Sequence, residues 1–198
     1  MSHARLPAMA TPGWARTLAA RLPVAATLIV LGALAIGPRP ILFGVAAVAA
    51  VTEELVRIDV SEHRLPNRVV LPLYPVILLS VVADGLIGGS SPLLALSSGA
   101  GWFAFLLVLC VAGGMGMGDV KLGGALGLCL GALGMVAAAS GLVLAFVAGA
   151  IGGAVALLLD GTSSAQPRRY RRIPFGPFLL FGFWLAVIGL TFLSADTA

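Results

Sequence analysis

The chain is a succession of long apolar runs separated by short polar loops. The runs cover approximately residues 18–37, 41–56, 69–87, 93–113 and 174–193, and a further 38 residues, from Leu122 to Leu159, carry no charge. As a helix that last stretch would measure about 57 Å, nearly twice a bilayer core of about 30 Å. It therefore predicts two helices that turn either near Gly131 to Gly134 or at Ser140-Gly141. The pattern as a whole predicts seven membrane helices.

The composition is typical of an all-α, polytopic membrane protein. Hydrophobic residues make up 60% of the chain and charged residues 10%, which leaves too little polar surface to cover a water-soluble core. We expect one integral domain over residues 1–198, in which residues 1–40 supply an N-terminal segment and the first span, and residues 41–193 the core. Both cysteines lie in apolar runs and no Cys or His spacing suits zinc. We expect no metal and no cofactor.

Basic residues fall in alternate loops, which predicts the orientation. Short cytoplasmic loops are rich in Lys and Arg, and with the N-terminus inside, 11 of the 12 basic residues are cytosolic; only Arg39 is not. This predicts an N-in, C-out bundle and explains the net charge of +4 without a nucleic-acid surface. The cytosolic set is Arg5, Arg16, Arg21, Arg57, Arg64, Arg68, Lys121, Arg168, Arg169, Arg171 and Arg172.

The first apolar run is the least regular one. Arg21, Pro23 and Pro38 interrupt it, so it also fits the apolar region of a signal peptide, whose cleavage would leave six spans. We favour a retained anchor. The later topology is the same in both cases.

Two aspartates stand where apolar runs meet polar loops on the same predicted side. Asp59 closes the second run, and Asp119 begins the helix after the fourth. Ionisable groups near hydrocarbon are expensive and usually functional. Two neighbouring carboxylates share a proton, so that one polarises a water while the other protonates a scissile carbonyl. The pair predicts aspartyl protease chemistry and titrates as a unit.

Each aspartate is flanked by residues that suit a tight turn. The loop after Asp59 ends in Leu65-Pro66-Asn67, where proline and asparagine turn the chain back. The second loop reads Gly116-Met117-Gly118-Asp119-Val120-Lys121. Its glycines allow close backbone approach, so we expect an extended substrate strand to lie against it.

These segments resemble the type 4 prepilin peptidases, a family of membrane-embedded aspartyl proteases. One signature of that family is an aspartate followed by a basic-rich turn ending in Ile/Leu-Pro-Asn/Asp, which residues 59–67 match. The other is a Gly-x-Gly-Asp-x-Lys box, which residues 116–121 match. The segment Ile173-Pro174-Phe175-Gly176-Pro177-Phe178 also resembles the family's entry into its last helix. The resemblance covers about residues 41–193.

The resemblance implies a bacterial inner-membrane enzyme with Asp59 and Asp119 as its catalytic pair. Its substrate would be a prepilin or pseudopilin, whose short basic leader is removed at the cytosolic face. Longer relatives carry an N-terminal domain with paired Cys-x-x-Cys motifs and methylate the new N-terminus. Those cysteines and that length are missing here, so we expect a peptidase without methyltransferase activity.

Supporting roles are less specific than the catalytic ones. The glycines of the second motif have helix packing as their alternative. Its lysine either stabilises the anionic form of the aspartate pair or is only a positive charge that helps to orient the chain in the membrane. We expect the proline and asparagine of the first loop to hold that loop, and Glu53 to pair with Arg57. Glu62 is a candidate for meeting the basic leader, and its role is left open. The supporting set is Gly116, Gly118, Lys121, Pro66, Asn67 and Glu62.

Two other functions compete with proteolysis. A cation- or proton-coupled carrier would use the paired aspartates as an ion relay, but such sites lie near the bilayer midplane and often in repeated halves. Here the acids lie at span ends, and no internal repeat is evident. A noncatalytic assembly scaffold has no separate support in the sequence.

Overall fold

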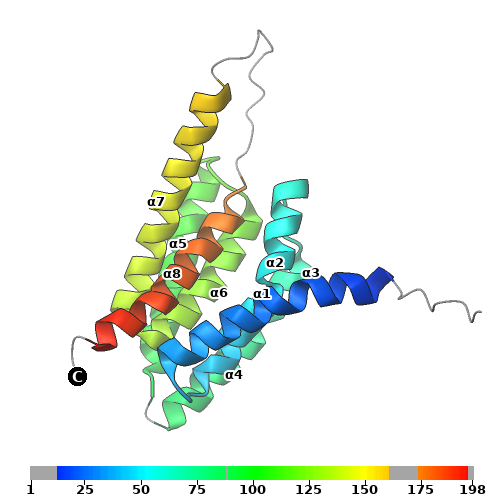
Figure 1. The fold of residues 1–198 in the computed structure, drawn as a ribbon. Coiled ribbons are helices and arrows are strands. Elements are labelled where there is room, and N and C mark those ends of the chain that lie inside the picture. The colour runs from blue at the N-terminus through cyan, green and yellow to red at the C-terminus, as the bar shows by residue number, and fades with distance from the viewer. Residues whose placement is uncertain (1–12, 88, 161–173, 196–198) are drawn as a thin grey trace, which may run out of the picture.

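The protein is an all-α bundle, as the hydrophobic pattern predicts (Figure 1). A computed structural model describes residues 13–87, 89–160 and 174–195, and in those ranges all the regular structure is helical. The helices are α1 (Gly13–Ile36), α2 (Ile41–Glu62), α3 (Asn67–Val70), α4 (Leu73–Leu86), α5 (Pro92–Val111), α6 (Met117–Leu133), α7 (Met135–Asp160) and α8 (Gly176–Ala195).

The long uncharged stretch divides at a single glycine. Helix α6 ends at Leu133 and α7 begins at Met135, while Gly134 between them has a φ of 130°. Side chains disfavour that backbone conformation, so glycine is the residue that suits the break. The turn near Gly131 to Gly134 is therefore confirmed, whereas Ser140 and Gly141 lie inside α7.

Three helical segments are long and apolar enough to cross a membrane: Asn67–Leu86, Pro92–Val111 and Met135–Ala156. The apolar helices Leu22–Ile36 and Gly176–Leu190 are shorter within the described residues. Helix α2 has 22 residues but is charged in its second half. The count of seven spans and the N-in, C-out orientation stay predictions, and Arg5 and the Arg168–Arg172 cluster lie outside the described residues.

Helix α6 is the centre of the bundle. Its residues from Val120 to Ala132 are almost all buried, and α5 packs closely along it. A Cβ at Gly127 would lie 2.6 Å from Trp102, and one at Gly131 would lie 2.6 Å from Ser98. These glycines are packing residues, as expected where membrane helices approach closely.

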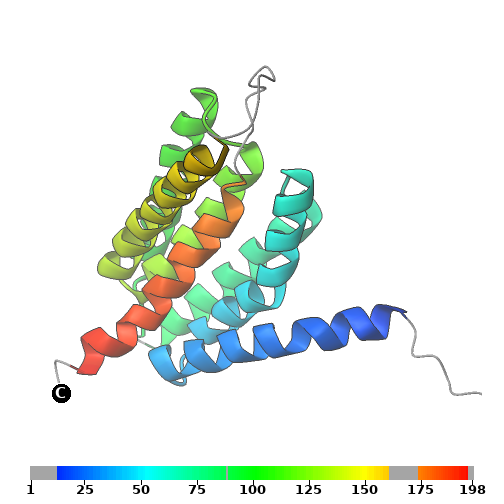
Figure 2. The same cartoon turned by 45° about the horizontal axis from the view of Figure 1, so that its top comes forward.

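Buried indole groups join the remaining helices. Trp102 of α5 donates to the Ala138 carbonyl of α7 at 3.2 Å, and Trp184 of α8 donates to Thr52 of α2 at 3.1 Å. Helix α1 contacts α2 and α8, yet in two views it runs obliquely to the other long helices, and its N-terminal end points away from the bundle (Figures 1 and 2). Helices α2 and α6, which carry Asp59 and Asp119, contact each other and the neighbouring α8.

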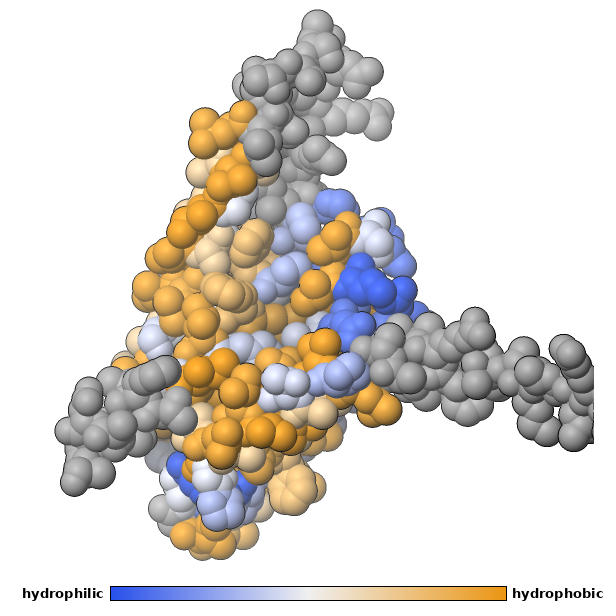
Figure 3. Space-filling model, in the orientation of Figure 1, coloured by the Kyte–Doolittle hydropathy of each residue, from blue (hydrophilic) through white to orange (hydrophobic). Residues whose placement is uncertain are grey.

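The surface is largely apolar on the face shown in Figure 3. Hydrophilic colours gather at two ends, near the C-terminal end of α2 and around the loop that follows α4 (Figure 3). An apolar belt between two polar ends is the arrangement that a bilayer requires.

An ion pair closes the end of the bundle that lies opposite Asp59. Asp84 of α4 is fully buried and accepts from Arg39 at 2.6 Å, while the backbone N–H of Ile41 lies 3.4 Å from its other oxygen. Arg39 also donates to the Gly89 carbonyl. From Ile41 to Asp59, α2 rises about 27 Å. The two buried acidic sites therefore lie at opposite ends of α2.

Removing one member of the Arg39–Asp84 pair should destabilise the bundle. We expect Asp84→Ala to lower the free energy of unfolding by about 3 kcal/mol, because it leaves a guanidinium without its buried partner. Arg57→Ala, which removes the Arg57–Glu54 pair on the same helix as Ile41, should change it by less than about 1 kcal/mol. Unfolding in mixed detergent and SDS micelles, followed by circular dichroism, would compare the two variants. Equal losses of stability would contradict a stabilising role for the buried Arg39–Asp84 pair.

Candidate active site

Asp59 lies in the last turn of α2, where the chain stops being helical. The helix continues three residues beyond it to Glu62, so Asp59 does not itself close the helix. His63 follows in a left-handed conformation, with a φ of 52°, and donates its backbone N–H to the Asp59 carbonyl at 2.9 Å. Leu65 and Pro66 then turn the chain into α3. The side chain of Asp59 is only 4% exposed.

The N-terminus of α8 holds the Asp59 carboxylate. The backbone N–H of Gly176 donates to Oδ2 of Asp59 at 2.9 Å, across 117 residues of sequence. A Cβ at Gly176 would lie 2.8 Å from the same oxygen, so only glycine lets the helix approach this closely. From the sequence alone Gly176 had no assigned role, although the Pro174-Phe175-Gly176-Pro177 run before an apolar helix was the signal that could have revealed one.

Asp119 lies in the first turn of α6, and its carboxylate caps that helix. The N–H of Gly116 donates to Oδ2 of Asp119 at 3.3 Å, which is one half of a capping box. The other carboxylate oxygen, Oδ1, is buried and has no hydrogen-bond partner in the described part of the chain. An unpartnered buried oxygen is costly, so it marks a position where a water or a substrate group would bind.

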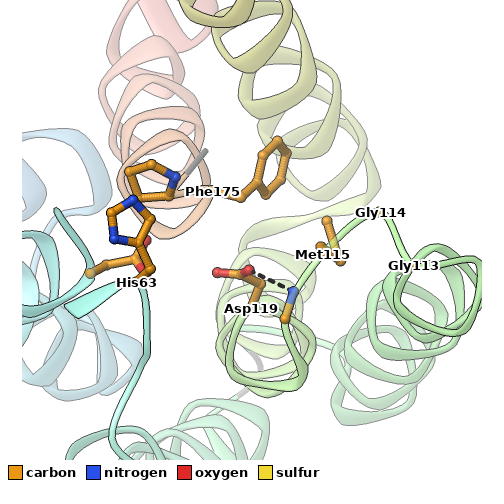
Figure 4. A pocket seen from close by; sticks show the side chains of 9 residues that line it. His63, Gly113, Gly114, Met115, Asp119 and Phe175 are labelled. Carbon is orange, nitrogen blue, oxygen red and sulfur yellow. Dashed lines mark hydrogen bonds between the residues drawn. The ribbon is translucent and has the colours of Figure 1, made fainter. Parts of the chain in front are cut away.

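The two carboxylates line one small cavity of about 60 Å³. That volume has room for a few water molecules. The carboxylate of Asp119 points into the space beside His63 and Phe175 (Figure 4). The structure thus brings together two acids that lie 60 positions apart in the sequence. The lining comprises Asp59, His63, Gly113, Gly114, Met115, Gly116, Asp119, Pro174 and Phe175.

A close contact between the two polar loops sets this arrangement. A Cβ at Gly118 would lie 2.8 Å from the Cβ of Leu65 and 3.3 Å from its backbone nitrogen. Gly118 therefore lets the loop after Asp59 rest directly on the start of α6. Gly116 has an ordinary extended backbone, and a Cβ there would be 3.5 Å from Asp119. Close packing therefore requires glycine at position 118, whereas position 116 has room for a Cβ.

The remaining supporting residues stabilise the loops or stay exposed. Lys121 donates to the side-chain oxygen of Asn67 at 3.0 Å, which ties α6 to α3. Pro66 is the N-cap of α3 in an extended conformation. Glu62 is exposed at the end of α2 and is absent from the cavity lining. Lys121 follows Asp119 by two positions, so it lies on nearly the opposite side of α6.

The expected pairing of Glu53 with Arg57 is wrong. Arg57 donates to both carboxylate oxygens of Glu54 at 2.9 Å. Either spacing, four residues or three, brings side chains together on a helix, so the sequence alone did not decide between the two glutamates.

Burial and mutual repulsion both disfavour ionisation of the pair. Asp59 and Asp119 lie beyond the apolar runs, at the polar ends of their helices. Desolvation raises the pKa of Asp59, which the Gly176 N–H and the nearby His63 partly oppose. Desolvation raises the pKa of Asp119 as well, the charge of Asp59 adds to this effect, and the Gly116 N–H opposes it. Such a pair retains a proton at a pH where ordinary aspartates are ionised.

Residues 41–158 match the family model described as the type IV leader peptidase family. The chain belongs to this family. Two curated relatives, each named prepilin leader peptidase/N-methyltransferase, come from Aeromonas salmonicida strain A449 and Aeromonas salmonicida. Each is 35% identical to this leader peptidase family member over 141 residues, which is 66% of this chain and 44% of the relative. The chain thus spans less than half of their length. No solved structure matches it.

The two glycines of the leader peptidase motif should respond differently to substitution. We expect Gly118→Ala to lower the free energy of unfolding by about 1–3 kcal/mol, because the new methyl group meets backbone and Cβ atoms of Leu65 that are fixed by the turn. Gly116→Ala should stay within about 0.5 kcal/mol. Melting temperatures of both variants in one detergent would test this. A larger loss for Gly116→Ala would contradict the loop contact.

Proposed function

We propose that Asp59 and Asp119 are the catalytic pair of an aspartyl endopeptidase that removes the short basic leader from prepilin or pseudopilin precursors. One observation carries the proposal: two buried aspartates face the same small cavity, and an oxygen of one of them has no partner among the described residues. Family membership and the name of the Aeromonas relatives support the substrate class.

The pair would act through one shared proton. The ionised carboxylate takes a proton from water, whose oxygen attacks the scissile carbonyl carbon. The protonated carboxyl gives its proton to the carbonyl oxygen, which yields a tetrahedral diol. Collapse of the diol breaks the C–N bond as the amide nitrogen receives a proton. Because the pair titrates as a unit, the acid and base roles belong to the pair rather than to either residue.

The surroundings of the cavity suit a peptide substrate. Backbone groups of Gly113, Gly114 and Gly116 line it, so an extended segment would lie against them without side-chain obstruction. Glu62 is exposed one residue before His63 and would attract a basic leader. The hydrophobic helix of the precursor would then remain in the bilayer. We place the site at the cytosolic face of a bacterial inner membrane, following the predicted orientation.

The position of the acids disfavours a carrier. Asp59 lies in the last turn of one continuous helix and Asp119 in the first turn of another. Coupling-ion sites instead use interrupted helices near the bilayer midplane.

We also predict that the new N-terminus is not methylated. The mass of the N-terminal residue of the cleaved product would test this.

Each catalytic aspartate should be indispensable for cleavage. We expect Asp59→Asn and Asp119→Asn to lower leader removal at least about 1,000-fold, because neither amide can share the proton. Asp119→Asn should melt no lower than the parent protein, since it removes a buried acid whose ionised form is unfavourable. The assay is co-expression with a candidate prepilin, followed by N-terminal analysis of the product.

Asp84→Asn is the matched control, because it removes a buried carboxylate at the other end of the bundle. It should reduce stability and leave cleavage per folded molecule within about twofold. Undiminished processing by either catalytic variant would sink the proposal.

The pH profile of cleavage should be bell-shaped, with an alkaline limb well above the ordinary aspartate range of about 4. Activity falls on the alkaline side when the raised pKa is passed and both carboxylates become anionic. On the acid side it falls when both are protonated. His63→Gln removes a positive charge that lowers the pKa of Asp59, so it should move the acid limb to higher pH. A shift to lower pH would contradict this electrostatic role; kcat/KM against pH is the measurement.

A further inference from the structure

An apolar groove opens between α4, α5 and α6, away from the carboxylate pair. Its volume of about 580 Å³ falls within the range of small-molecule sites, about 300–1,000 Å³. Apolar side chains form most of its walls, and Leu71, Leu78 and Leu96 are 48%, 37% and 50% exposed. The lining comprises Leu71, Tyr74, Leu78, Leu96, Gly99, Ala100, Phe103, Lys121, Gly124 and Leu128.

The groove is elongated along the helix axes. Lys121, Gly124 and Leu128 follow one face of α6 over about 10 Å. Helix α5 runs in the opposite direction, so Phe103 lies beside Gly124 and Gly99 lies beside Leu128. One end of the groove is therefore polar, with Lys121 and Tyr74, and the other is entirely apolar. An extended hydrocarbon chain has this shape and this polarity.

The polar end carries a cation, Lys121, that forms no ion pair with the residues that the structure describes. Lys121 donates to the neutral amide oxygen of Asn67. Tyr74 donates its hydroxyl to the Lys121 carbonyl at 2.7 Å, which fixes this end of the groove. The exposed Arg68 follows Asn67 directly. A phosphate is the anionic group that basic residues at a membrane surface bind.

We propose that this groove binds an anionic phospholipid, with one acyl chain along α4, α5 and α6 and the phosphate against Lys121. The hydrophobic helix of a substrate is not its occupant, because Lys121 lies on nearly the opposite side of α6 from Asp119. Lipid binding does not require the proposed peptidase activity. A bound lipid would hold the Asn67–Lys121 contact, and thereby the loop that follows Asp59, in place.

Native mass spectrometry of the purified full chain in detergent would test the site, with phosphatidylglycerol and phosphatidylcholine of identical acyl chains as probes. We expect one phosphatidylglycerol to bind in preference to phosphatidylcholine. Lys121→Gln should weaken phosphatidylglycerol binding roughly fivefold, the contribution of one cation near anionic lipid, and leave phosphatidylcholine unchanged. Ala100→Phe, which fills the groove from α5, should weaken the binding of both lipids.

Arg57→Gln is the matched control, because Arg57 is exposed and lies outside the groove lining. It should leave both affinities unchanged. Equal binding of the two lipids, an equal loss in Arg57→Gln and Lys121→Gln, or displacement of the lipid by inorganic phosphate alone would overturn the proposal. The proposal would also be overturned if Ala100→Phe changed the oligomeric state and left lipid binding intact.

Discussion

The burial of two carboxylates at the end of an apolar bundle is the constraint on which the rest of the structure depends. Charge is strongly disfavoured there unless hydrogen bonds and helix termini compensate for lost hydration. Asp59 receives the Gly176 N–H at the start of α8, and Asp119 receives the Gly116 N–H at the start of α6. Two helix N-termini, which favour negative charge, therefore converge on one cavity. They compensate only in part, and this leaves the pair with a retained proton.

Helix α2 links two kinds of buried acid. At one end, the Asp84 carboxylate accepts from the Arg39 guanidinium through both oxygens and from the backbone N–H of Ile41, an arrangement that suits a stabilising role. At the other end, Asp59 accepts one backbone N–H among the described residues, that of Gly176, and repels Asp119 across a cavity. The same residue type thus lies in two different environments, which suit two different tasks. The acid with a guanidinium partner would serve stability, and the two acids without one carry the proposed reaction.

Helix α6 separates two sites on its opposite sides. Asp119 faces the carboxylate cavity, whereas Lys121 faces the groove shared with α4 and α5. The Lys121–Asn67 contact joins them, because Asn67 begins the helix that follows the Asp59 loop. Small residues on α6 allow α5 to pack closely against it, and this packing holds α6 in place. A lipid in the groove would therefore act on the site through a short, continuous set of contacts.

The sequence by itself determined the helical class and the two turns and singled out the acid pair, because these follow from local hydrophobicity, turn chemistry and the cost of charge near hydrocarbon. It left the break in the long uncharged stretch open between Gly131 to Gly134 and Ser140-Gly141, and the structure put the break at Gly134. Only the tertiary structure decided that Gly176 would hold Asp59, that Gly118 would admit Leu65, and that Lys121 would meet Asn67. Each of these contacts joins segments at least 50 residues apart, where no periodicity links the partners. Close packing alone selects such partners, since it depends on which backbone atoms are brought together when the helices assemble.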